Sequence, residues 1–279
     1  MKHRAWNVKY NMFQDSRFKI QSQRGFTLIE LLIVIGIVAI LATVTLLVLN
    51  PAEMLKQGRD SKRLSELNTI NEGLNFAASQ KPNLVLGTSN AVYISLPDTA
   101  SDCSSFTSLP DLPPGWSYRC ATETDYRKVD GNGWIPVDFT GLASTVFSSL
   151  PVDPVNSEVG SLYYSYVAGT SWELNAVVES EKYGSGGSRD VAGGDGGTNA
   201  GVFERGTNLS LAPLLCGDIN QDRLITMDDF DVLNNFIYFS GTVSDGAVTD
   251  LDNSSSTDAL DLQLLFYYLS GGLTPTCGY

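Results

Sequence analysis

Apolar side chains form one unbroken run near the N-terminus, over residues 26–49. Glu30 is the only charged residue among these 24 positions. As a helix the run is roughly 36 Å long, enough to cross a hydrocarbon core of about 30 Å, so it predicts a transmembrane span. A carboxylate in hydrocarbon costs roughly 2.5–3.5 kcal/mol, and this apolar helix offers no cation. We therefore expect the partner of Glu30 to come from outside the helix.

A helical period replaces the continuous run after Asn50. Pro51 removes a backbone hydrogen bond and clashes with the preceding turn, which predicts a kink or local melting there. Beyond it, apolar residues recur three or four positions apart up to about Gln80, and charged residues lie between them. The apolar positions are Leu64, Leu67, Ile70, Leu74 and Ala78. The pattern predicts an amphipathic continuation of the helix, with one face available to a β-sheet.

The polar face of this second helical segment includes Asp60, Lys62 and Arg63. Two interpretations of these side chains remain open. They form either a solvated face or ionic bridges between neighbouring subunits.

Short apolar runs separated by Gly, Pro, Ser and Asp occupy residues 83–215 and predict strands. They are Ala91–Leu96, Trp116–Arg119, Gly133–Val137, Leu162–Val167 and Ser171–Val178. The last two flank a short turn, which is typical of a β-hairpin. We expect an α+β head in which an antiparallel sheet packs on the amphipathic helix. The Gly-rich segment 183–201, with Asp190 and Asp195, is interpreted as a surface loop, with a calcium loop as the alternative.

Two acidic twelve-residue loops, 32 residues apart, lie in the C-terminal region. The first loop, residues 218–229, places oxygens at Asp218, Asn220, Asp222, Leu224 (its backbone carbonyl), Thr226 and Asp229. The second loop, residues 250–261, does so at Asp250, Asp252, Ser254, Ser256, Asp258 and Asp261. These are positions 1, 3, 5, 7, 9 and 12 of an EF-hand-type calcium loop. Because an apolar helix follows each loop at the same offset, we expect a small all-α module that binds two calcium ions.

The two loops depart from the usual calcium loop in ways that affect affinity. Position 6, where glycine allows a sharp turn, holds Arg223 in the first loop and Ser255 in the second. Ser254 at position 5 removes a charge from the second loop, and Asp258 at position 9 is expected to act only through water. We therefore expect the first loop to bind calcium more tightly.

Cysteine and histidine usage limits the possible chemistry. The chain has four cysteines without a Cys-x-x-Cys spacing, and its single histidine is His3, which argues for disulfides rather than zinc in an exported chain. Four cysteines allow three pairings, of which we favour the local one, Cys103–Cys120 with Cys216–Cys277. Without a histidine after residue 3, a His-based catalytic triad is excluded, and we expect no enzyme activity.

Charge is divided unevenly along the chain. The first 25 residues carry a net charge of +5, whereas residues 26–279 contain 12 basic and 30 acidic residues and carry −18. A basic segment before the span orients the N-terminus to the cytoplasm, so the remainder is expected to be exported. The acidic surface argues against non-specific nucleic-acid binding, which depends on Lys and Arg.

The stretch Gly25 to Glu30, with the sequence Gly-Phe-Thr-Leu-Ile-Glu, resembles the start of type IV prepilins and type II secretion pseudopilins. The resemblance implies that a prepilin peptidase cuts between Gly25 and Phe26 and methylates the new N-terminus. It also implies that Glu30 pairs with the N-terminal amine of a neighbouring subunit. The alternative, a Sec signal peptide, has a shorter apolar region and lacks the acid. The stretch Leu150–Pro154 resembles, more weakly, the segment before the sheet of major pseudopilins.

The duplicated loop and helix resemble a type I dockerin, a domain that docks onto cohesins. Positions 10 and 11, where cohesin reads a Ser-Thr pair, differ here: they are Met227-Asp228 and Ala259-Leu260. The resemblance implies a structural calcium module or, as a further possibility, a module that binds a cohesin-like protein.

Together these patterns predict four regions. They are a cleaved leader (1–25), a pilin helix (26–80, transmembrane over 26–49), a β-rich head (81–215) and the dockerin-like module (216–279). The predicted function is a structural subunit of a type IV pilus or related surface filament. The alternatives are a type II secretion pseudopilin and a surface adhesin or tether.

The resemblance also implies the partners and the location of the chain. The partners are the other pilin subunits, the prepilin peptidase, the inner-membrane assembly platform and, before assembly, membrane lipid. The precursor is expected in the cytoplasmic membrane and the assembled form outside the cell.

Overall fold

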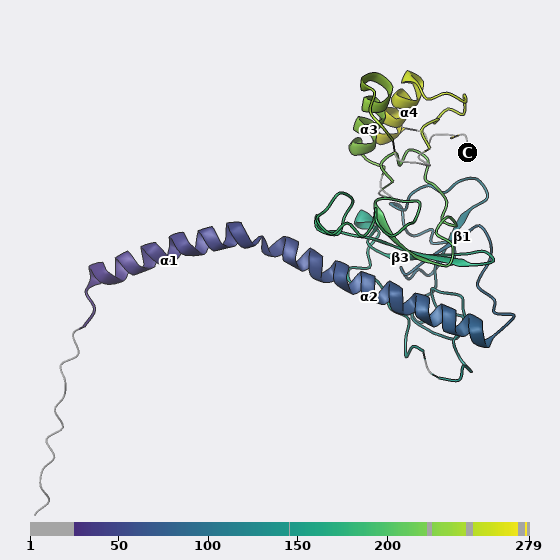
Figure 1. Ribbon diagram of the computed structural model, residues 1–279, viewed down its shortest axis with the longest axis horizontal. Coiled ribbons are helices and arrows are strands. Elements are labelled where there is room, and N and C mark those ends of the chain that lie inside the picture. The colour runs from purple at the N-terminus through teal and green to yellow at the C-terminus, as the bar shows by residue number, and fades with distance from the viewer. Residues whose placement is uncertain (1–24, 145, 222–224, 244–247, 273–276, 278–279) are drawn as a thin grey trace, which may run out of the picture. The chain divides into compact units, whose positions relative to one another are not determined.

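The computed structural model describes residues 25–144, 146–221, 225–243, 248–272 and 277 (Figure 1). The chain divides into two units, Met1–Asn50 and Pro51–Tyr279. Helix α1 (Leu28–Leu49) is the regular element of the first unit. Its segment Leu28–Thr45 has a mean hydropathy of 2.7 and, within the described residues, is the one helix long and apolar enough to cross a membrane. The predicted apolar N-terminal helix is therefore present.

The helix breaks at the Asn50-Pro51 step, as its sequence predicts. Asn50 has φ 36° and ψ 71°, in the left-handed region, and ends α1. Helix α2 (Pro51–Gln80) begins at the proline. A proline is compatible with the first turn of a helix, where its missing N–H has no partner to lose, but cannot continue the helix before it. Local chemistry thus fixes both the end of α1 and the start of α2.

One face of α2 packs on the sheet of the head. Leu67, Ile70 and Leu74 are fully buried, in agreement with the predicted period. Ala77 is the buried alanine, whereas Ala78, which the spacing placed on this face, is exposed. The face follows the 3.6-residue turn, which brings a residue three positions after Leu74 back to the core.

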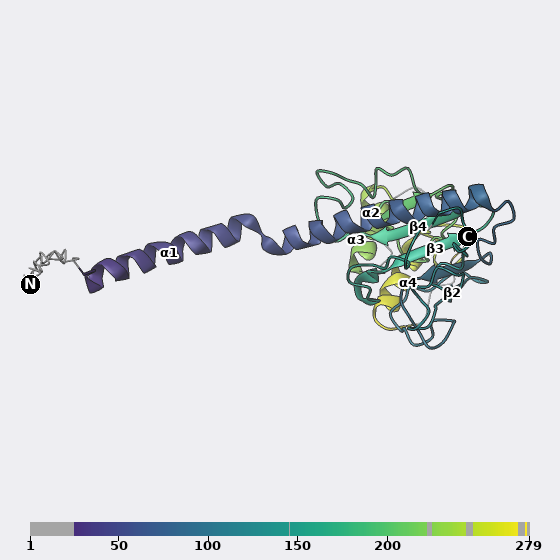
Figure 2. The ribbon, with the colours of Figure 1, turned by 90° about the horizontal axis from the view of Figure 1, so that it is seen from below.

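The head contains a five-stranded mixed sheet (Figure 2). The strands are β1 (Ala91–Ile94), β2 (Ser117–Arg119), β3 (Tyr164–Ala168), β4 (Trp172–Val177) and β5 (Val202–Gly206), in the order β2-β1-β3-β4-β5. The hairpin β3–β4 is antiparallel, as predicted, and so are β1–β3 and β4–β5. The expectation of a wholly antiparallel sheet is wrong, because β1 and β2 are parallel. Residues 95–116 between them supply the long crossover that a parallel pair requires.

One strand assigned from the sequence is wrong, and one strand was missed. Gly133–Val137 forms no strand; Trp134, Ile135 and Val137 are core side chains on an irregular segment next to an isolated bridge between Asp130 and Asp138. Strand β5 was not predicted, since it directly follows the Gly-rich segment. Apolar alternation alone does not distinguish core-filling loop residues from a paired strand. A short 3-10 helix, η1 (Val159–Ser161), precedes β3.

Both faces of the sheet are covered. Tyr164, Tyr166 and Leu174 point to the α2 side and join the main core with Leu67 and the other buried residues of α2. The opposite face carries a second cluster, made by side chains of β1 and β3 and by the loops over them. A disulfide between Cys103 and Cys120, with Cα atoms 5.3 Å apart, closes these loops.

The C-terminal module has its own small core. Helices α3 (Met227–Phe239) and α4 (Ala259–Leu269) each follow one of the acidic loops. Their core side chains are Ile219, Leu233, Leu251, Leu262 and Leu265. A second disulfide joins Cys216 to Cys277, with a Cα–Cα distance of 5.8 Å, and brackets the module. Both disulfides are those of the local pairing favoured from the sequence.

Candidate functional site

The N-terminal junction presents a short extended segment before α1. Gly25 and Phe26 precede the helix, and the Phe26 side chain is 85 % exposed. Thr27 caps the helix: its Oγ1 accepts a hydrogen bond from the Glu30 N–H at 3.2 Å, and Glu30 Oε2 accepts one from the Thr27 N–H at 3.4 Å. This reciprocal pair is a capping box. The peptide bond expected to be cut is thus outside the helix and accessible.

The capping box adds a contact of Glu30 that the sequence did not predict. The sequence argument placed its partner outside its own helix, because that helix contains no cation. In the single chain Glu30 accepts hydrogen bonds from the N–H and hydroxyl of Thr27, the N-cap residue, and its charged partner stays a prediction. The first N–H groups of any helix lack intrahelical acceptors, and an acid at the third position satisfies one of them. Both contacts are 3.4 Å long and exposed, so they are weak ones.

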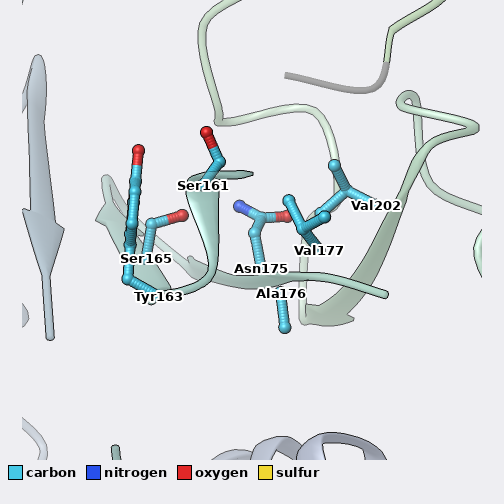
Figure 3. Close-up of a pocket in the computed structure, with 7 residues that line it drawn as sticks. All are labelled: Ser161, Tyr163, Ser165, Asn175, Ala176, Val177 and Val202. Atoms are coloured by element: carbon cyan, nitrogen blue, oxygen red, sulfur yellow. The ribbon is translucent and has the colours of Figure 1, made fainter. Parts of the chain in front are cut away.

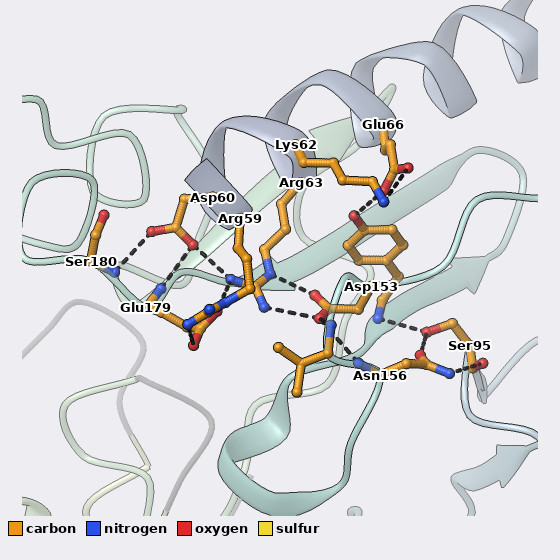
Figure 4. A network of polar contacts seen from close by, with 12 residues as sticks. Arg59, Asp60, Lys62, Arg63, Glu66, Ser95, Asp153, Asn156, Glu179 and Ser180 are labelled. Atoms are coloured by element: carbon orange, nitrogen blue, oxygen red, sulfur yellow. Dashed lines mark hydrogen bonds and ion pairs between the residues drawn. The ribbon is translucent and has the colours of Figure 1, made fainter. Parts of the chain in front are cut away.

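Arg63 lies at the centre of a buried ionic cluster beneath α2 (Figure 4). Its Nε and Nη2 atoms donate to the two oxygens of Asp153, at 2.6 and 2.9 Å. Its Nη1 atom donates to Asp60 at 2.7 Å and to Glu179 at 2.6 Å. Arg63, Asp60 and Asp153 are 0–3 % exposed. Both interpretations from the sequence, a solvated face and bridges between subunits, are therefore wrong for Asp60 and Arg63.

The cluster joins α2 to two segments far away in the sequence. Asp60 also accepts the backbone N–H groups of Glu179 and Ser180, just after β4. Asp153 accepts those of Val155 and Asn156, before β3. Lys62, on the outer side of α2, forms a looser pair with Glu66 at 3.7 Å. The ionic cluster thus fixes the position of α2 over the sheet.

Electrostatics in this cluster follow from its hydrogen bonds. The pKa of Glu179 is lowered by hydrogen bonds from Arg59 and Arg63, which outweigh the effect of burial. Burial by itself lowers the pKa of Arg63, but its hydrogen bonds to Asp153, Glu179 and Asp60 raise it overall. Arg63 and Glu179 are therefore both charged at neutral pH.

The two acidic loops share one arrangement of hydrogen bonds. In the first loop, Asp229 Oδ1 accepts the N–H groups of Ile219 and Asn220, and Oδ2 accepts that of Thr226. In the second, Asp261 makes the same three contacts, to Leu251, Asp252 and Asp258. Each partner in the second loop lies 32 residues after its counterpart in the first. The repeat seen in the sequence is therefore a repeat in structure, in which position 12 closes each loop.

Position 9 has a structural role that the loop pattern alone did not reveal. Thr226 is the N-cap of α3 and accepts the Asp228 N–H at 3.2 Å. Asp258 is the N-cap of α4 and accepts the Leu260 N–H at 2.8 Å. Each forms a capping box with the position 12 aspartate. The sequence signal was available, since a capping residue three positions before an acid precedes each apolar helix.

The second loop brings its carboxylates together. Asp250, Asp252 and Asp261 each have an oxygen within 4.8 Å of the others, the one such group among the residues that the structure describes. Asp250 accepts the N–H groups of Ser254 at 2.9 Å and Ser255 at 2.7 Å, so the loop wraps around it. Ser254 and Ser256 hydroxyls lie 3.0 Å apart on the same turn. Converging carboxylate and hydroxyl oxygens fit a hard cation such as Ca²⁺.

The turn at position 6 has the backbone conformation expected of a glycine. Ser255 has φ 69°, in the left-handed region. A side chain at such an angle costs roughly 1–2 kcal/mol. The sequence argument that glycine is favoured at this position agrees with the geometry of the second loop. Arg223, at the same position of the first loop, lies outside the described residues.

The first loop is described only in part. Asp222 and Leu224, which the sequence assigns as ligands, lie outside the described residues. Asp218 and Asp229 are 3 % and 0 % exposed. The expected order of affinity between the two loops therefore remains a prediction.

The backbone of the Gly-rich segment hydrogen-bonds to the aspartates of the same segment. Asp190 accepts the N–H groups of Gly186 and Gly193, and Asp195 accepts those of Gly197 and Glu204. These contacts agree with the interpretation as a loop of tight turns. They also bring Asp195 against β5, a contact that the sequence did not predict.

Comparison with protein-family models matches residues 20–46 to the prokaryotic N-terminal methylation motif. The matched segment contains Gly25, Phe26 and Glu30 and most of α1, and it supports a type IV pilin or pseudopilin subunit. No curated protein and no solved structure gives a significant match.

Proposed function

We propose that this chain is a structural subunit of a type IV pilus or a related surface filament. The observation that carries the proposal is the methylation motif at residues 20–46, placed where a basic segment meets an apolar helix. Proteins with this motif are structural subunits. The peptidase would cut between Gly25 and Phe26, and the polymer would form through α1.

The surface of α1 supports this assembly mode. Its described side chains are exposed and apolar around the helix, for example Ile29 at 67 %, Ile33 at 53 % and Leu41 at 58 % exposure. An all-round apolar helix needs lipid or other helices around it. Membrane lipid fits the precursor, and α1 helices of neighbouring subunits fit the filament. In the filament, Glu30 would exchange its weak cap contacts for the methylated amine of a neighbour.

Two substitutions of Glu30 separate its roles. Glu30→Gln retains the acceptor of the capping box but removes the charge, whereas Glu30→Ala removes both. If charge pairing drives assembly, both variants lose surface filaments while the head remains folded and exported. Filaments from Glu30→Gln at the wild-type level would show that the side chain acts only as a cap. The type II pseudopilin alternative predicts loss of secretion on deletion, without long fibres.

The C-terminal module is proposed to bind two calcium ions that stabilise it. The converging carboxylates of Asp250, Asp252 and Asp261 and the repeated closing contacts of Asp229 and Asp261 support this. Calcium would counter the charge of residues 217–272, which hold ten acids and one arginine. It would therefore raise the melting temperature of the module by mass action.

Calcium titration of the full chain in detergent tests this part of the proposal. Asp250→Asn is expected to remove one ion and to lower the calcium-dependent stabilisation. Asp218→Asn is expected to have the larger effect, since the first loop is predicted to bind more tightly. Asp231→Asn, an exposed acid on α3, removes the same charge outside both loops and serves as the control. Equal calcium binding by wild type and both loop variants would reduce the loops to acidic turns.

A tether function is a second candidate, and a difference between the two helices favours it. Leu260, Phe266 and Tyr267 on α4 are 53–56 % exposed and line an apolar pocket with Leu264. The positions 32 residues earlier on α3 are polar: Asp228, Asn234 and Asn235. The core is repeated, but the exposed apolar side chains of α3 lie at other positions, such as Tyr238 and Phe239.

Binding to a purified cohesin domain tests the tether. Phe266→Ser with Tyr267→Ser would abolish the binding, whereas Asn234→Ser with Asn235→Ser, at the matching positions of α3, would not. No binding by the wild-type chain in calcium would exclude the cohesin as partner.

A further inference from the structure

One face of β4 and β5 carries polar side chains into the interior of the head. Glu173 and Asn175 lie two residues apart on β4, on the face opposite to Leu174. Glu204 on β5 pairs directly with Asn175 in the antiparallel ladder. Residues paired in this way share a face of the sheet. Glu173 and Glu204 are 0 % exposed and Asn175 is 1 % exposed, so three polar side chains converge away from water.

Backbone N–H groups satisfy one oxygen of each carboxylate. Glu173 Oε2 accepts the N–H groups of Leu211 and Ala212, at 2.7 and 2.9 Å. Glu204 Oε2 accepts the Asn199 N–H at 2.9 Å. The other oxygen of each, Oε1, and both amide atoms of Asn175 have no hydrogen-bond partner among the described residues. Four buried polar atoms in one place thus lack a partner.

The surroundings add negative charge to this cluster. Asp195 lies beside it and accepts the Glu204 N–H at 2.6 Å. Glu173 and Glu204 also interact directly, one carboxylate against the other, away from water. No ion pair to Glu173, Glu204 or Asp195 is present in the described part of the chain. The cluster therefore attracts a positive charge.

We propose that a divalent cation of the calcium type binds between Glu173 Oε1 and Glu204 Oε1, with the amide oxygen of Asn175 as a third ligand. Carboxylate and amide oxygens are the ligands that Ca²⁺ prefers. A shared proton would neutralise only one carboxylate and would leave the Asn175 amide unpaired. The cation satisfies both carboxylates and the amide oxygen. This site is separate from the two C-terminal loops.

A small cavity next to Asn175 gives room for a water ligand. It has a volume of about 10 Å³ and is lined by Ser161, Tyr163, Ser165, Asn175, Ala176, Val177 and Val202. Figure 3 shows the Asn175 amide extending from β4 between Ser165 and Val202. A cavity of this size holds about one water molecule. The cation would tie β4 and β5 to the segments that carry Asn199 and Leu211.

The test counts calcium ions on the full chain in detergent. The background is Asp218→Ala with Asp250→Ala, which disables both C-terminal loops and separates this site from the module. Titration calorimetry with calcium chloride should then show one ion per chain. Glu204→Gln or Glu173→Gln should lower the affinity for calcium by more than about 10–100-fold, which is the loss caused by removing a residue that only hydrogen-bonds to a metal ligand. Glu123→Gln, which removes an exposed charge from the head, should leave it unchanged.

A melting experiment provides a second test, because loss of calcium binding in a variant could also arise from a misfolded head. After cleavage the tryptophans are 116, 134 and 172, all in the head, so their fluorescence follows head unfolding alone. Glu204→Gln mimics a neutral Glu204, so in chelator it should have a higher melting temperature than the parent. Calcium should not raise the melting temperature of this variant further. Calcium should raise the melting temperature of the parent by several degrees. A parent head that binds no calcium and melts at the same temperature with and without it would overturn the proposal in favour of a shared proton.

Discussion

Arg63→Met tests the ionic cluster under α2 most sharply. Methionine retains most of the aliphatic volume but removes the fork that pairs with Asp153, and the contacts to Asp60 and Glu179. The carboxylates of Asp60 and Asp153 then stay buried without their cation. The cost arises from these unpaired charges more than from the lost arginine itself.

The structure sets the size of the effect. Breaking a buried ion pair from one side costs about 3–5 kcal/mol. Asp60 keeps the N–H groups of Glu179 and Ser180, and Asp153 keeps those of Val155 and Asn156, so the lower half of that range is expected. For a chain of this size 1 kcal/mol shifts the melting temperature by about 2–4 °C, which gives a decrease of roughly 6–16 °C.

Tryptophan fluorescence of the full chain in detergent measures this decrease in the head. Lys62→Met is the matched control, because Lys62 is exposed on the outer side of α2 and its pair with Glu66 is long, at 3.7 Å. It should melt close to the wild type. Arg63→Lys should fall between the two, since lysine keeps the charge but not the fork. Equal melting temperatures for Arg63→Met and Lys62→Met would refute the view that the cluster holds α2 on the sheet.

Three further outcomes are expected. Ser255→Gly should stabilise the second loop by about 1 kcal/mol, seen as a higher melting temperature of the module, because φ 69° favours glycine; Ser254→Gly should not. The pKa of Glu179 is lowered in the folded state, so its ion pairs stabilise the head above its ordinary pKa of 4.5, and this stabilisation is lost as the pH falls below that value. The melting temperature of the wild type should therefore fall towards that of Glu179→Gln in acid. A difference in melting temperature that does not change with pH would contradict this role of Glu179. Opening the Cys216–Cys277 bond, which spans 61 residues, should destabilise the module by about 4 kcal/mol on the chain-entropy model, measured by melting of a double Cys→Ser variant; an unchanged transition would show that the bond has no effect.

The helical part of the fold was readable from the sequence because its signals are local. The apolar run, the proline at position 51 and the three-to-four spacing up to Gln80 each act within a turn or two of helix. The same holds for the repeat of an acidic loop followed by a helix, whereas calcium binding by the loops stays a prediction. The β3–β4 hairpin also has its strands close together in the chain. These features agree with the structure.

The features that could not be predicted from the sequence depend on contacts between distant segments. Arg63 reads as a surface residue of an amphipathic helix until Asp153 and Glu179, some 90 and 116 residues later, meet it in the core. The parallel pair β1–β2 depends on a long crossover that no short pattern encodes. Glu173 and Glu204 carried a weak signal, as acids within largely apolar strands, but strand pairing was needed to place them together.

The central claim is tested most directly by mass spectrometry of the exported protein in sheared surface filaments. The account predicts a subunit that begins at Phe26, with one methyl group on its N-terminal amine. The same peptide map should recover the C-terminal module in the filament. A subunit that begins at Met1, or after residue 49, would contradict assignment to the pilin class.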